Sequence, residues 1–249
     1  MFADDPFART AVDENDAAGD ALVVAHDAAY CVRGYRSFEF ASFSARAGEV
    51  LALFGTDRVA ARDLALACAG LVRPTAGTLS VAGIDVAGRA RLAAGIAGVG
   101  VFSGLVDADG SLTVEECVGH ELRLRRAAGV DVLEYLAEFG LATQAEQRVD
   151  MLAPAARARL SAALACAGGV RVAALDLDDP FADGLSTRDA RLVVTLAQRY
   201  ARAHRICVVV ATREPAVACA ADAAVALDIP AAEALACQMA ASSEEVGAA

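Results

Sequence analysis

A buried strand that ends in a glycine and leads into a helix most constrains the fold of this chain. VLALF at 50–54 is an unbroken apolar run, Gly55 marks the turn after it, and a helix is expected over 62–70. Further strands are expected over 22–26, 38–45, 78–82, 96–102, 170–177, 205–211 and 223–227, and further helices over 115–127, 131–139, 155–167, 187–203, 214–220 and 231–241. This order predicts an α/β fold with a small antiparallel β part and a helical subdomain.

The composition along the chain predicts three parts. Residues 1–20 are rich in aspartate and are expected to form a disordered acidic leader. Residues 21–230 are expected to form the α/β domain, with a helical insert at about 103–168, and residues 231–249 a C-terminal helix and tail. No run reaches the roughly 18 apolar residues that a membrane span needs. Direct membrane insertion is therefore not expected.

Charge and cysteine usage exclude several classes of function. The net charge of -11 has no offsetting basic stripe in the sequence, which argues against a nucleic-acid partner. Seven cysteines without a C-x-x-C pair are typical of buried thiols in a reducing compartment such as the cytoplasm. All 22 basic residues are arginines, so the chain has no lysine for a phosphate-binding loop.

The segment after Gly55 begins like a phosphate-binding loop but departs from its pattern. The pattern is G-x-x-x-x-G-K-[ST], in which backbone N–H groups cradle phosphates, the lysine reaches them and the hydroxyl binds Mg²⁺. With Gly55 as its first glycine, the required Gly, Lys and Ser or Thr fall on Ala60, Ala61 and Arg62. The sequence thus leaves open whether this is a working phosphate site.

Motifs in a fixed order connect these elements. They are AGEVLALFG (47–55), AGLVRPTAGTLSVAGIDV (69–86), GVGVF (98–102), SLTVEE (111–116), FGLA (139–142), RVDMLAP (148–154), DDPF (178–181), GLS (184–186), VVATREP (209–215) and AADAAVALD (220–228). In this order and spacing the chain resembles the nucleotide-binding subunit of ATP-binding cassette (ABC) transporters over almost all of 20–230. The resemblance implies a P-loop NTPase-like ABC ATPase fold and ATP with Mg²⁺ as ligands. It further implies an integral-membrane permease, with a second ABC subunit, as partners at the inner face of the membrane.

The resemblance assigns the degenerate phosphate loop to Gly55, Thr56, Asp57, Arg62 and Asp63. Asp57 and Asp63 put carboxylates at a helix start, where N–H groups would attract phosphate. An internal carboxylate is therefore expected to cap this helix. Arg62, in the place of the Mg²⁺-binding hydroxyl, is expected to pair with Asp57 or Asp63; the alternative is that it reaches phosphate.

The resemblance places the metal and the general base at the end of the strand RVAALDLDDPF. The simplest alignment gives Asp178 the Mg²⁺ and Asp179 the role of general base, and the alternative register gives the Mg²⁺ to Asp176. Elsewhere the family's residues are replaced: the glutamine after GVGVF by Ser103, the signature motif by LAPAA at 152–156, the switch histidine by Arg213 and the D-loop aspartate by Ser186.

These departures predict an ABC-transporter-type ATP-binding subunit with a degenerate catalytic set, a pseudo-ATPase that supports a membrane permease. A homodimer would lack two good signature motifs, which favours a heteromer. Two alternatives stay open: an active but divergent Mg²⁺-ATP-dependent ATPase that uses Arg62 with the acids at 176–179, and a soluble regulatory or scaffold protein.

Overall fold

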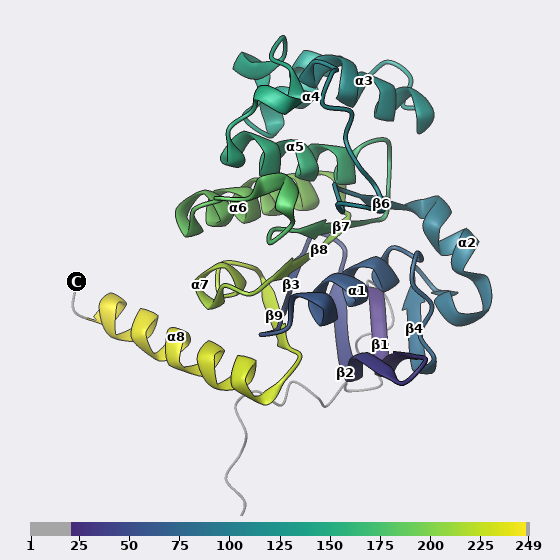
Figure 1. Cartoon of the computed structure of the whole chain (residues 1–249), viewed down its shortest axis with the longest axis vertical. Coiled ribbons are helices and arrows are strands. Elements are labelled where there is room, and N and C mark those ends of the chain that lie inside the picture. The colour runs from purple at the N-terminus through teal and green to yellow at the C-terminus, as the bar shows by residue number, and fades with distance from the viewer. Residues whose placement is uncertain (1–20, 248–249) are drawn as a thin grey trace, which may run out of the picture.

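A five-stranded parallel sheet forms the centre of the molecule (Figure 1). The computed structural model describes residues 21–247. In the sheet order β6-β7-β8-β3-β9, the strands are β6 (Ala97–Val99), β7 (Val172–Asp176), β8 (Cys207–Thr212), β3 (Val50–Phe54) and β9 (Ala223–Ala226). β3, β7 and β8 are buried along their whole length because elements cover both faces of the sheet. Their sequences are therefore continuous apolar runs.

A four-stranded antiparallel sheet lies on one side of this centre, with the order β2-β1-β4-β5. Its strands are β1 (Ala21–Val32), β2 (Tyr35–Arg46), β4 (Ala76–Val81) and β5 (Ile84–Asp85). Helix α1 (Arg58–Cys68) lies between the two sheets and shares one apolar core with both of them. The α/β fold with a small antiparallel part is thus confirmed.

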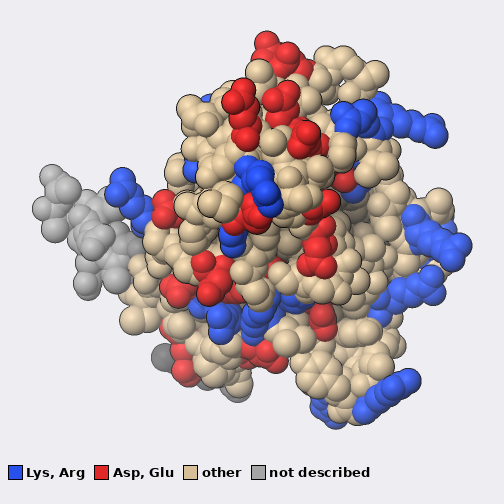
Figure 2. Space-filling model, turned by 45° about the horizontal axis from the view of Figure 1, so that its top comes forward, with Lys and Arg blue, Asp and Glu red and all other residues tan. Residues whose placement is uncertain are grey.

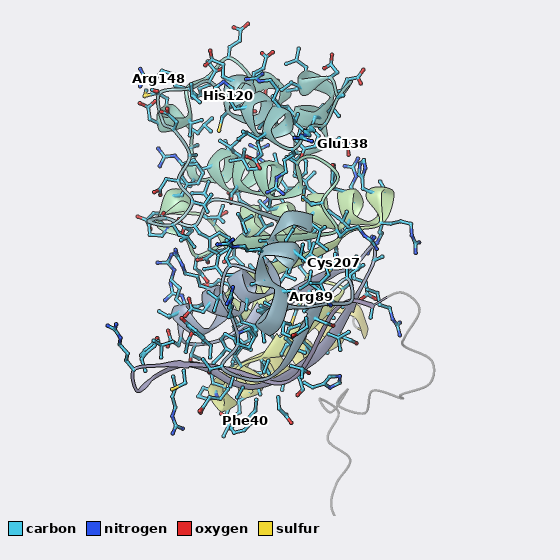
Figure 3. The ribbon with its side chains drawn as sticks, turned by 90° about the vertical axis from the view of Figure 1, so that its right-hand side faces the viewer. Phe40, Arg89, His120, Glu138, Arg148 and Cys207 are labelled. Atoms are coloured by element: carbon cyan, nitrogen blue, oxygen red, sulfur yellow. The ribbon has the colours of Figure 1, made fainter. Side chains whose placement is uncertain are left out.

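Helices cover the other face of the parallel sheet and extend away from it (Figure 1). α5 (Pro154–Cys166) and α6 (Thr187–His204) pack on the sheet, and α3 (Val114–Leu124) and α4 (Val132–Glu138) lie beyond them. His120 and Arg148 at this helical end are far from Phe40, which points outward from the antiparallel sheet (Figure 3). The remaining helices are α2 (Val86–Ile96), α7 (Pro215–Ala218), α8 (Ile229–Gly247) and the short 3-10 helices at Ala142–Gln144, Val149–Met151 and Pro180–Ala182.

Most expected elements are present, and the main differences concern α2, α1 and β6. Helix α2 is not predicted by the sequence pattern. Gly88 and Gly95 interrupt the segment, Arg89 has non-helical backbone angles, and the helix buries only Val86 and two alanines, so it has no clear apolar face. Helix α1 begins at Arg58, earlier than the expected 62. The strand expected over 96–102 is only Ala97–Val99, since the chain turns back at the bridge between residues 102 and 106.

The ends of the chain are described only in part. The expected acidic leader at 1–20 and the last two residues lie outside the described range. The expected C-terminal helix is present as α8 and runs from Ile229 to Gly247. Among the described helices, none combines the length and the apolar character that crossing a membrane requires.

Gly98 in β6 is expected to be intolerant of any side chain. A Cβ atom there would lie 2.0 Å from the Ala165 carbonyl oxygen of α5, whereas a Cβ atom at Gly95 would meet nothing within 4 Å. Gly98→Ala should therefore lower the free energy of unfolding by about 2 kcal/mol through overpacking. Gly95→Ala, in a helix, should raise it slightly. Urea unfolding of both variants tests this, and equal effects would contradict the close approach of β6 and α5.

Candidate functional site

The connection between β3 and α1 is too short to form the expected phosphate loop. β3 ends at Phe54 and α1 begins at Arg58, which leaves only Gly55, Thr56 and Asp57 between them. In the phosphate-loop pattern, six residues run from the first to the second glycine before the lysine. Helix α1 therefore begins before the backbone could wrap around a phosphate group.

Two N–H groups where this short loop joins α1, those of Thr56 and Val59, already have carboxylate acceptors inside the protein. Asp57 caps α1, since its Oδ1 accepts from the Val59 N–H at 2.8 Å. The Thr56 N–H and hydroxyl both donate to Asp228 Oδ2 at 2.9 Å, just before α8. The expected internal cap is thus confirmed for Asp57. Asp228, which no pattern in the sequence singled out, is a second carboxylate at the place where phosphate would bind.

The other positions of the pattern face away from the loop. Asp63 accepts a 2.7 Å hydrogen bond from the Ser37 hydroxyl of β2, so the expectation that it lies at the helix start is wrong. Ala61, in the place of the lysine, is 1% exposed and packs in the core between the sheets. The face of α1 that meets the carboxyl ends of the strands carries Arg58 and Arg62, four residues apart.

Arg62 pairs with two acids at the end of β7 and just after it, and not with its sequence neighbours Asp57 and Asp63. Its Nη1 lies 3.2 Å from Asp179 Oδ2 and 4.0 Å from Asp176 Oδ2, and its Nη2 donates to the Ser103 carbonyl at 2.9 Å. The expected pairing with Asp57 or Asp63 is therefore wrong. The Arg62 side chain points away from these two acids, because its guanidinium extends over the Phe102 ring, 5.5 Å from the ring centroid, toward the end of β7.

Arg58 is a second cation beside the same two acids, and Arg58, Arg62, Asp176 and Asp179 together form what we call the arginine cluster. The Arg58 Nη2 lies 3.2 Å from Asp179 Oδ2 and 3.4 Å from Asp176 Oδ2. Arg58 is not among the site residues predicted from the sequence. The available signal was the spacing of two arginines four residues apart in a chain without lysine.

The Asp179 carboxylate has no oxygen free for chemistry. Oδ2 accepts from Arg58, Arg62 and the Ser103 N–H, and Oδ1 accepts from the Ser103 hydroxyl and the Phe181 N–H. The side chain is only 2% exposed. A general base needs an available lone pair directed at a proton of the substrate. The contacts of Asp179 instead give it a structural role as an acceptor of five donors.

Asp176 at the end of β7 and the two acids that follow it have different side-chain partners. Asp176 lies beside Arg58, and burial raises the pKa of its carboxyl to about 6, although Arg58 opposes the shift. Asp178 is turned toward the end of β8, where its Oδ2 accepts from the Arg213 N–H at 2.6 Å. Burial also raises the pKa of the Asp178 carboxyl, although the hydrogen bond from the Arg213 N–H opposes this shift. Asp178, the expected Mg²⁺ ligand, is thus outside the arginine cluster.

These contacts do not fit a complex of Mg²⁺ and a nucleotide. The guanidinium groups of Arg58 and Arg62 already neutralise Asp176 and Asp179, and Arg62 replaces the hydroxyl that would complete a metal site. Within residues 21–247, no group of three or more His, Cys, Asp or Glu side chains is placed to hold a metal ion. Acidic and basic side chains also lie next to one another over the middle of the face in Figure 2.

Comparison with known proteins identifies the class of this fold. No family model matches the chain. The structure of cbiO1 from Clostridium perfringens, part of the ABC transporter complex cbiONQ, matches with a TM-score of 0.65 and 16% identity over 84% of this chain and 85% of that one. The ATP-binding cassette MJ0796, in a dimeric post-hydrolysis state bound to ADP and Pi, matches with a TM-score of 0.64 and 18% identity over 83% of this chain and 94% of that one. The fold is that of the ATP-binding cassettes.

A curated relative supports the same resemblance at the level of sequence. The Nod factor export ATP-binding protein I of Neorhizobium galegae is 33% identical over 143 residues, which are 56% of this chain. The match spans 40% of the length of that relative. The resemblance to ABC-transporter nucleotide-binding subunits, expected from the motifs, is thereby confirmed.

Proposed function

We propose that this chain is an ABC-type subunit that supports a membrane permease without hydrolysing ATP. The observation that carries the proposal is the pairing of Arg58 and Arg62 with Asp176 and Asp179. These ion pairs use the acids that would otherwise hold Mg²⁺ or act as general base, and the two guanidinium groups take the place of the metal ion. The three-residue loop, with Asp57 and Asp228 as its acceptors, supports the same conclusion. A fold can persist after its chemistry is lost.

The relatives support a permease partner. The similar cbiO1 belongs to an ABC transporter complex, and the sequence relative is an export ATP-binding protein. By analogy, we propose that this chain acts at the inner face of the membrane with an integral-membrane permease, beside a second ABC subunit that supplies the ATP hydrolysis. The second subunit is part of the proposal because Arg58 and Arg62 occupy the Asp179 carboxylate that would act as general base in this one.

Calorimetric titration of the full chain with Mg²⁺-ATP tests the proposal. We expect no binding tighter than about 1 mM, which corresponds to roughly -4 kcal/mol. Arg62→Ala serves as the test variant and Arg202→Ala as a control, since Arg202 pairs with Asp222 at the start of β3, the end opposite the site. Binding tighter than that limit in the wild type, lost in Arg62→Ala and kept in Arg202→Ala, would instead support the divergent ATPase.

A further inference from the structure

Three segments that are distant in sequence meet at the Asp179 carboxylate. Helix α1 contributes Arg58 and Arg62, the turn after β6 contributes Ser103, and the chain after β7 contributes the Phe181 N–H. Ser103 is held through all of its polar groups, since its N–H and hydroxyl donate to Asp179 and its carbonyl accepts from Arg62. The cluster therefore anchors the turn after β6 through every polar group of Ser103.

The cluster is balanced in charge without any added ion. Two aspartates that are both nearly buried, at 1% and 2% side-chain exposure, would repel each other unless cations lie between them. Arg58 and Arg62 supply two positive charges, and their planar groups can each contact more than one acceptor. An external cation at this place would have to displace both guanidinium groups.

The turn that Ser103 anchors is itself a closed unit. The Phe102 N–H donates to the Val106 carbonyl, and the N–H groups of residues 105 and 106 donate to the Phe102 carbonyl, each at 2.9 Å. Arg62 lies over the ring of Phe102, which is fully buried. The arginine cluster and this turn are thus joined by contacts between the parallel sheet and the chain that leads to α3.

We infer that the Arg58–Arg62–Asp176–Asp179 cluster is a permanent internal substitute for a bound cation and phosphate, which fixes the turn at 102–106 in one position whether or not nucleotide is present. This inference rests on the proposed function, since it concerns how the same site is regulated. The surface around the turn at 102–106 then has the same conformation with and without ATP, and any conformational response of the assembly to ATP arises in another subunit.

Amide hydrogen exchange on the full chain tests the inference. In the double variant Arg58→Ala/Arg62→Ala, the Ser103 amide should exchange about ten times faster or more than in the wild type, because local opening governs protection. Arg213→Ala is the control and should leave this amide unchanged, because its ion pair with Asp178 does not contact Ser103. In the wild type, millimolar Mg²⁺-ATP should not change exchange at residues 102–106.

The possible outcomes separate the inference from the proposed function. Unchanged exchange in the double variant, with Mg²⁺-ATP also without effect, would overturn the internal substitute and leave the non-hydrolysing function standing. Slower exchange at 102–106 on addition of Mg²⁺-ATP to the wild type would overturn the inference, because nucleotide would then act on the turn, and only ATP turnover in the same sample would overturn the proposed function as well. If circular dichroism shows that the double variant is unfolded, Arg62→Lys decides by the same measurement. This variant keeps the charge but loses the fork that joins Asp179 to the Ser103 carbonyl, and faster exchange of Ser103 is again expected.

Discussion

Replacing Asp179 with alanine is expected to lower the free energy of unfolding by about 3 kcal/mol, because removal of one partner leaves buried charges and N–H groups unpaired. The five donors to this carboxylate come from Arg58, Arg62, Ser103 and Phe181. Both arginines keep some contact with water, at 29% and 18% side-chain exposure, which places the expected value at the lower end of the range for buried pairs. For a chain of this size the melting temperature should fall by roughly 6–12 °C.

The sign of this effect distinguishes a structural cluster from a metal site. Acids gathered to bind Mg²⁺ repel one another in the metal-free protein, so removal of one of them stabilises the fold. An increase in stability of metal-free Asp179→Ala would therefore contradict the arginine cluster. Asp150→Ala is the control, because Asp150 pairs with Arg148 at an exposed site and such a pair contributes at most about 1 kcal/mol. Thermal and urea unfolding with chelator present provide both measurements.

The general architecture could be predicted because local sequence and global fold agree in most of the chain. The unbroken apolar runs of β3, β7 and β8 indicate strands covered on both faces. The capping box of Thr113 and Glu116 at the start of α3 is present as expected, and Pro154 begins α5. These signals act within a few residues, so one sequence is sufficient to identify them.

The contacts of the site could not be predicted in the same way. Arg62 lies near Asp57 and Asp63 in sequence, but its partner is Asp179, because the carboxyl ends of β3 and β7 reach the same edge of the sheet. Such pairing depends on the direction of side chains across three strands. The loop carboxylate Asp228 is likewise brought to Thr56 by β9, which pairs with β3. A pattern aligned from Gly55 alone contains neither contact.

Asp176 should make the protein more stable as the pH falls from about 7 toward 5, which is opposite to ordinary acid denaturation. Burial raises the pKa of this carboxyl from 3.8 to about 6, so between these values the folded state binds more protons than the unfolded state. Stability then falls as pH rises through this window. A difference of this size between the folded and unfolded pKa corresponds to roughly 3 kcal/mol at most.

The contribution of Asp176 is isolated by comparing unfolding of the wild type and Asp176→Asn from pH 4.5 to 7.5. The amide of the variant cannot titrate, so the difference in unfolding free energy between the two proteins should change with pH in favour of the wild type at the acidic end. Other titrating groups, including Asp178, are common to both proteins and largely cancel. Parallel curves would mean that Arg58 and the Asp178 N–H compensate the burial of this carboxylate in full. A difference of the expected sign would show that Arg58 and the Asp178 N–H do not fully compensate the burial of the Asp176 carboxylate, which accepts fewer hydrogen bonds than the Asp179 carboxylate with its five donors.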